Sequence, residues 1–115
     1  MADVLKRVPV REQDPQVRAK NFDEVCLGYN AEEAVEEANR VIGCKNAKCV
    51  QGCPVSIDIP AFIDKVKGGW FEEAYQIIGQ SSALPAICGR VCPQESQCEG
   101  QCIRGKKGDP VSIGK

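Results

Sequence analysis

The stretch CGRVCPQESQCEGQC, residues 88–102, decides the fold of this chain together with the stretch CKNAKCVQGCP, residues 44–54. The former carries four thiols in the pattern C-x3-C-x5-C-x3-C, and the latter carries three in the pattern C-x4-C-x3-C. One cysteine in each stretch directly precedes a proline, which removes a backbone N–H and fixes the local turn. This density of thiols predicts a structure organised around cysteine chemistry, with either metal ligands or disulfides.

Working outward from these stretches, the whole chain has 115 residues, eight cysteines and no histidine. The absence of histidine excludes Ser-His and Cys-His catalytic pairs and every zinc site that contains an imidazole. The N-terminal sequence MADVLKRVPVREQDPQ lacks the apolar core of a signal peptide. We therefore expect a cytoplasmic protein with reduced thiols, in which cysteine clusters bind metal. A disulfide framework is the alternative.

The spacing of the thiols favours iron–sulfur clusters over zinc. Structural zinc sites usually take their ligands from close pairs, and this sequence contains no C-x2-C pair. A 4Fe–4S cluster takes four thiolates, and ferredoxin-type runs end in Cys-Pro, which occurs twice here. Zinc is the second interpretation of the metal. A thiol redox enzyme is disfavoured, because its C-x-x-C motif is absent.

Hydrophobic periodicity predicts an all-α fold with irregular cysteine-rich loops. Apolar residues recur at helical spacing within residues 31–42, 60–67 and 70–78, and Pro85 and Pro93 each open a short helical turn. Asn30 and Glu33 are spaced as a capping box. No segment alternates with period two, so a sheet is not expected. Residues 1–25 are expected to form an arm with a short helix near residues 17–22, and residues 26–115 the helical domain.

Other side chains are assigned roles from their type and position. Trp70 is expected to anchor packing, and the acidic run within residues 32–37 is expected to form a solvated helix face. Ile87, Val91 and Ile103 are expected to cover the metal sites and limit water. The net charge of −1 and the lack of a long apolar run predict neither a nucleic-acid partner nor a membrane partner.

The segments CKNAKCVQGCPVSIDIPAFI (residues 44–63) and LPAICGRVCPQESQCEGQCIRGKKGDPVSIGK (residues 84–115) resemble one family closely. It is the N-terminal iron–sulfur domain of glutamate synthase small (beta) subunits. Related domains occur in NADH-dependent ferredoxin:NADP oxidoreductase and in dihydropyrimidine dehydrogenase. The resemblance implies an α-helical ferredoxin-like domain that carries two 4Fe–4S clusters. It also implies electron transfer between an FAD/NAD(P)H reductase module of the same polypeptide and a partner oxidoreductase subunit.

The resemblance further assigns the ligands residue by residue. For one cluster they are Cys44, Cys49 and Cys102, and for the other they are Cys53, Cys88, Cys92 and Cys98. Some relatives replace one thiolate of the latter cluster with a Gln or Glu side chain, which makes Glu95 the alternative to Cys88. The other interpretation of Glu95 is an exposed carboxylate at the start of a helical turn.

The chain departs from the family pattern at one position. The family opens with C-x2-C-x4-C-x3-C-P, and this sequence has Val41 where the first cysteine belongs. Cys26 is the candidate replacement, and its alternative role is that of a small buried hydrophobe. Without Cys26 the first cluster is expected to be incomplete, water-ligated or absent.

The expected function is therefore electron transfer, with no catalysis by this domain alone. The family's reductase module follows VSIGK (residues 111–115), and no G-x-G-x-x-G motif occurs here. We thus expect a fragment of an NAD(P)H-dependent oxidoreductase, with FAD and NAD(P)H bound only by the missing part. The alternative function is a structural or subunit-docking domain, stapled by zinc or by a single cluster without redox turnover.

Overall fold

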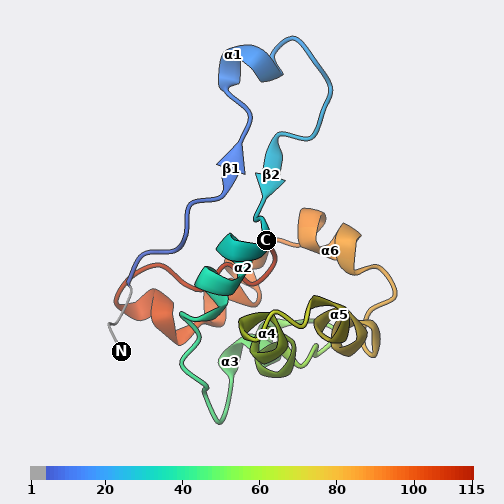
Figure 1. Cartoon of the computed structure of the whole chain (residues 1–115). Helices are drawn as coiled ribbons and strands as arrows, with labels where there is room; N and C mark the ends of the chain where they lie inside the picture. The colour runs from blue at the N-terminus through green and yellow to red at the C-terminus, as the bar shows by residue number, and fades with distance from the viewer. Residues whose placement is uncertain (1–4) are drawn as a thin grey trace.

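The computed structural model describes residues 5–115, which form a mainly helical domain with a projecting arm (Figure 1). This architecture confirms the predicted all-α class. The helices are α1 (Pro15–Arg18), α2 (Ala31–Ala38), α3 (Lys48–Gly52), α4 (Ile59–Lys67), α5 (Phe71–Gly79) and α6 (Pro85–Val91). Three 3-10 turns follow, η1 (Gln94–Ser96), η2 (Glu99–Gln101) and η3 (Ile103–Lys106). None of the helices within residues 5–115 is long and apolar enough to cross a membrane.

The core lies where α4 packs against both α2 and α5. Its buried centre consists of Ala38, Ile59 and Ile63, and half-buried residues of α3 and of the C-terminal segment pack around it. Both α2 and α4 begin with a side-chain cap, of which the sequence analysis predicts the one at Asn30. Asn30 Oδ1 accepts a hydrogen bond from the Glu33 amide at 2.8 Å, and Glu33 returns one to the Asn30 amide at 3.0 Å.

The predicted helix over residues 31–42 ends early, at Ala38. The amides of Arg40 and Val41 bond to carbonyls three residues back instead of four, which tightens the last turn. Gly43 then adopts a φ of 69°, a left-handed conformation that favours glycine and turns the chain towards the cysteine loop. This early stop releases Val41 from the helix, and Val41 and Cys44 line the same cavity.

Trp70 is not the packing anchor that its type suggests. Its side chain is 61% exposed at the start of α5. A Cβ on Gly68 would lie 2.5 Å from the indole Cδ1, so the ring rests over the end of α4. The pair Gly68-Gly69 therefore ends α4 and makes room for the indole ring beside that end.

A small sheet that the sequence pattern did not predict forms the base of the arm. Strands β1 (Arg11–Glu12) and β2 (Cys26–Gly28) pair antiparallel, with α1 at the far end of the arm (Figure 1). The strands are only two and three residues long, too short for period-two alternation to appear. Phe22, in the connection after α1, is fully exposed.

A buried ion pair joins the arm to the domain and corrects the expectation of a fully solvated acidic face. Glu37 is 2% exposed, and its carboxylate accepts from Arg40 Nη1 at 2.7 Å. The same carboxylate accepts from the backbone amides of Val8 and Ser112, both at 2.8 Å. Arg40 also donates to three backbone carbonyls, those of Leu5, Asp109 and Pro110. The pair thus ties α2 to both ends of the described chain.

Candidate metal centres

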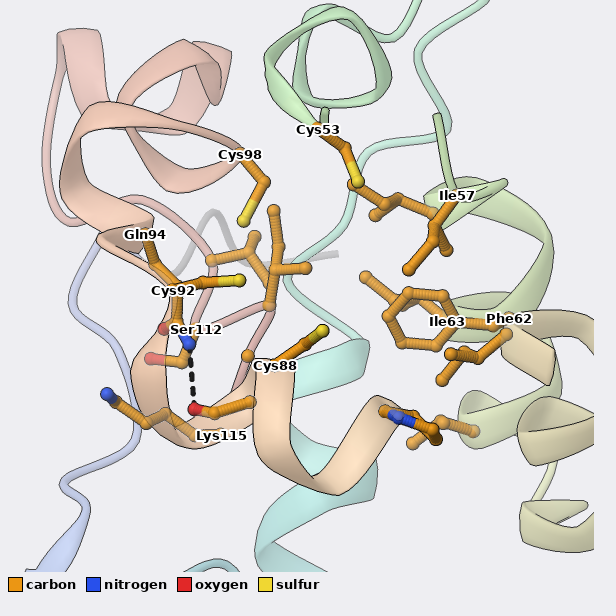
Figure 2. Close-up of a pocket in the computed structure, with 18 of the residues that line it drawn as sticks. Cys53, Ile57, Phe62, Ile63, Cys88, Cys92, Gln94, Cys98, Ser112 and Lys115 are labelled. Atoms are coloured by element: carbon orange, nitrogen blue, oxygen red, sulfur yellow. Dashed lines mark hydrogen bonds between the residues drawn. The ribbon is translucent and has the colours of Figure 1, made fainter. Parts of the chain in front are cut away.

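The larger of two cysteine-lined cavities, here called the second site, has a volume of about 490 Å³. Its four cysteines are Cys53, Cys88, Cys92 and Cys98. Figure 2 shows their sulfur atoms facing a common space, with Ile57, Phe62 and Ile63 on the opposite wall. These four thiols are the set that the family resemblance implies for one cluster.

Short helical segments position the thiols of the second site. Cys88 lies on α6 and Cys92 caps its C-terminus, with the Cys92 amide bonded to the Cys88 carbonyl at 3.1 Å. One helical turn therefore separates the two side chains and keeps them on one face. Pro93 follows and stops the helix, which turns the chain towards Cys98 at the start of η2.

The smaller cavity, here called the first site, has a volume of about 150 Å³. Its cysteines are Cys44, Cys49 and Cys102, and Val41 lines the same cavity. The backbone amide of Val111 donates to Cys102 Sγ at 3.5 Å, as amides do to cluster ligands.

The two sites share the elements that build them. Helix α3 carries Cys49 towards the first site and ends at Cys53 in the second, while the η2 turn has Cys98 at one end and Cys102 at the other. Because η2 is a 3-10 turn with about three residues per turn, residues four positions apart do not share a face, and the thiols of Cys98 and Cys102 diverge. Ile59, Ile63, Val111 and Ile113 line both cavities, which therefore adjoin.

Close backbone contact holds α3 against these turns. A Cβ on Gly52 would lie 2.5 Å from the backbone oxygen of Gln97, so only glycine permits this approach. A Cβ on Gly100 would likewise overlap the Glu95 carbonyl. The glycines of the motifs CVQGC and CEGQC therefore set how near the two cysteine segments can come.

The thiols of each site influence one another's ionisation. Burial raises the pKa of Cys98 to about 11, and the nearby charges of Glu99 and Cys53 contribute to the rise. Burial also raises the pKa of Cys49, with contributions from Cys102 and Cys44. Such thiols are protonated at neutral pH, and metal binding must displace their protons.

The pKa of Cys92 is also raised by desolvation and by thiols that line the same cavity. Desolvation raises its pKa, followed by the charges of Cys88 and Cys53. Each of these three shifted cysteines therefore interacts with thiols of its own site. This pattern agrees with the division of the seven cysteines into the two cavities.

Two candidates from the sequence lie outside both cavities. Cys26 is in β2, where it pairs with Glu12. Glu95 is exposed in η1 and lines neither cavity. Its neighbour Gln94 is buried, lines the second site and donates to the Gly89 carbonyl at 2.9 Å (Figure 2).

Sequence reasoning considered Glu95 and missed Gln94, the residue before it in the motif CPQE, as a residue of the second site. Gln94 Oε1 is buried without a hydrogen-bond partner among the described residues. An amide oxygen without a partner at the wall of a thiol cavity can accept a hydrogen bond from a bound group or act as an oxygen ligand to it. Within the motif CPQE, the glutamine therefore lines the second site, and the glutamate is exposed to solvent.

The three residues expected to cover the sites are exposed. Val91 and Ile87 are 70% and 52% exposed and line neither cavity. Ile103 is 46% exposed but lines the first site, as expected. Cys88 and Cys92 occupy the inner face of α6, and the spacing of 3.6 residues per turn places Ile87 and Val91 on another face. Further apolar cover comes from α4 and the C-terminal segment.

The donor chemistry of both sites fits iron–sulfur clusters. Within residues 5–115, no three Cys, Asp or Glu side chains are close enough to hold a single metal ion. The thiols instead surround cavities of about 490 and 150 Å³, and a cubane cluster is larger than one ion. Cysteine is the ligand type that such clusters take.

A helical domain with thiols around two adjoining cavities defines an iron–sulfur protein of the electron-transfer class. The family described as dihydropyrimidine dehydrogenase domain II, 4Fe–4S cluster, matches residues 18–115. This chain belongs to that family.

Curated relatives agree with this membership. The glutamate synthase [NADPH] small chain of Halomonas elongata is 37% identical over 112 residues, which cover 93% of this chain and 24% of the relative. The corresponding small chain of Escherichia coli is 34% identical over 110 residues, 96% of this chain and 23% of the relative. Subunit PreT of the NAD-dependent dihydropyrimidine dehydrogenase of Escherichia coli is 36% identical over 94 residues, 82% and 23% respectively. The chain thus spans about a quarter of the length of these oxidoreductase subunits.

Proposed function

We propose that this chain carries two clusters and passes electrons between an FAD/NAD(P)H reductase module and a partner subunit of a glutamate synthase-type oxidoreductase. The observation that carries the proposal is the pair of adjoining thiol cavities, which share α3, η2 and the residues Ile59, Ile63, Val111 and Ile113. Adjoining clusters can exchange electrons because only a thin layer of side chains separates them.

In this proposal the first site holds its cluster through Cys44, Cys49 and Cys102. The second site uses the other four motif cysteines, which are Cys53, Cys88, Cys92 and Cys98. The clusters supply one-electron chemistry when bound. The chain's own residues hold the iron, exclude water with the side chains of α4, and donate the Val111 amide to Cys102 Sγ.

The partners follow from the family rather than from this domain. Relatives named as NADPH- and NAD-dependent oxidoreductase subunits support a flavin- and nicotinamide-bearing module as one electron partner. We assign no substrate turnover to the domain itself, which offers thiols as ligands and no histidine. We also place it in the cytoplasm, because its eight free thiols require a reducing compartment.

The test is anaerobic loading of the chain with iron and sulfide, followed by titration with dithionite. We expect a brown protein with about eight irons that accepts about two electrons, one for each cluster. The variant Cys92→Ala is expected to lose the second cluster alone, leaving about half of the iron. Cys26→Ala serves as the matched control, because Cys26 lines neither cavity.

The alternative function, a stapled structural domain, predicts other results. A colourless chain that binds zinc stoichiometrically, or a brown chain that dithionite does not bleach, would contradict the electron-transfer proposal. The same titration therefore separates the two functions.

A further inference from the structure

The first site is one donor short of the four that a 4Fe–4S cluster takes. Cys44, Cys49 and Cys102 line its cavity, and the side chain at the position of the family's fourth cysteine is Val41. A valine has no lone pair to offer iron. The second site, in contrast, has four thiols around its cavity.

No thiolate or carboxylate of the described residues replaces the missing cysteine. The lining of the first site contains no carboxylate, and its amide side chains, Asn46 and Gln101, carry no charge with which to replace a thiolate. Cys26 is held in β2 by pairing with β1, and it lines neither cavity.

The first site is also close to solvent. Ile42, which lines it next to Val41, is 58% exposed, and Asn46 and Lys48 in its lining are exposed as well. Solvent or a small solute can therefore reach the side of the cavity where the fourth donor is missing. Lys48 and Arg104 also line this cavity, and their positive charges favour the binding of a small anion such as hydroxide.

We propose that the first site is a three-thiolate site, in which one iron of the cluster has no protein ligand and is exchangeable. This inference rests on the proposed function, since it assumes that a cluster binds there. The ligand expected at that iron is a small anion from solvent. Mild oxidation is then expected to remove that iron and no other.

The oxidation conserves iron, charge and electrons. A 4Fe–4S core of charge 2+ gives one electron to ferricyanide, releases one Fe²⁺ and leaves a 3Fe–4S core of charge 1+. All four sulfides stay with the protein. The three-iron product is paramagnetic in its oxidised form, whereas the four-iron core of charge 2+ is not, so electron paramagnetic resonance detects the conversion directly.

The experiment treats the anaerobically loaded chain with one equivalent of ferricyanide and measures iron content and the resonance signal. We expect iron to fall from about eight to about seven per chain, with a three-iron signal, and Fe²⁺ with dithionite to reverse both changes. Val41→Cys is expected to stay at about eight irons without that signal. Val41→Ala and Cys26→Ala, as matched controls, are expected to behave like the unmodified chain.

Three results would overturn the inference. In the first, the unmodified chain keeps about eight irons after ferricyanide treatment. In the second, the first site stays empty unless Val41→Cys is introduced. In the third, the Cys26→Ala variant loses the first cluster. The unmodified chain alone decides the first result, so the test stands even if Val41→Cys fails to fold. A chain that loads no cluster in either site would instead contradict the proposed function.

Discussion

Replacing Glu37 by alanine is expected to lower the free energy of unfolding by about 3–5 kcal/mol, because it breaks a buried ion pair from one side. The side chains of Glu37 and Arg40 are 3% and 2% exposed, and 2.7 Å separates their charged atoms. The substitution leaves the guanidinium buried without its carboxylate. It also takes an acceptor from the amides of Val8 and Ser112, each of which is bound at 2.8 Å.

The size of the effect follows from where these contacts lead. The Val8 bond fixes the segment before β1, and the Ser112 bond fixes the segment whose residues line both metal sites. An unsatisfied buried amide costs about 1–3 kcal/mol, but the segments can shift towards water, so these losses overlap with that of the ion pair. We therefore keep the total at about 3–5 kcal/mol.

Urea unfolding of the anaerobically loaded chain, followed by circular dichroism, measures this change. A slope of about 1–3 kcal/mol per molar urea converts it to a drop of roughly 2 M in the midpoint. Glu73→Ala is the matched control, since its pair with Lys65 spans 3.2 Å between side chains that are 47% and 43% exposed. That loss is expected to stay below about 1 kcal/mol.

The double variant Glu37→Leu with Arg40→Met separates the pair from its surroundings. Apolar replacement of both partners removes the buried charge as well as its counter-charge, so the double variant is expected to be more stable than Glu37→Ala. The reasoning is refuted if Glu37→Ala unfolds within about 1 kcal/mol of the unmodified chain.

Further predictions concern close packing and the arm. Gly52→Ala would place a Cβ 2.5 Å from the Gln97 backbone oxygen, so we expect a loss of about 1–3 kcal/mol and weaker cluster retention at both sites. Gly79→Ala, with nothing within 4 Å of the added Cβ, should be neutral or stabilising in the same unfolding assay. Burial raises the pKa of Tyr29 above its ordinary value of 10, so ultraviolet titration should show a phenol that ionises later than free tyrosine. Because the folded-state pKa is the higher one, this contribution to stability is present below pH 10 and is lost as the pH rises through the folded-state pKa. Tyr29→Phe removes the 2.7 Å hydrogen bond from the Tyr29 hydroxyl to the Val8 carbonyl, which joins the arm to the domain. We expect this variant to lose about 1 kcal/mol of stability and to show faster amide exchange in the arm. Unchanged exchange would contradict this role of Tyr29.

Local chemistry made much of the helical structure predictable. The Asn30–Glu33 capping box, the prolines at the starts of α4 and α6, and Gly68-Gly69 after α4 are each signals within a few residues. The end of α2 was less predictable, because apolar residues continue to Ile42 in the sequence. Long-range bonds of Glu37 and Arg40 to both chain ends accompany the earlier stop.

Side-chain type alone gave wrong predictions of which residues are buried. Glu37 has the sequence context of a surface residue and is buried, because Arg40 and two amides satisfy its carboxylate. Trp70, Ile87 and Val91 are apolar and exposed, because α5 and α6 turn other faces towards the core and the thiols. Such exchanges depend on which segments meet, and no local pattern specifies that.

The sequence by itself determined that the chain is helical, that its chemistry is thiol chemistry without histidine, and that position 41 lacks a cysteine. Only the tertiary structure decided that α3 and η2 lie close enough for each to face both cavities, that Cys26 lies in the two-stranded sheet at the base of the arm, and that Gln94 faces the second site. The physical reason is the range of the interactions. Helix caps and periodicity act within a few residues, whereas a metal site is closed by backbone contacts such as that of Gly52 with Gln97, which join segments far apart in the chain.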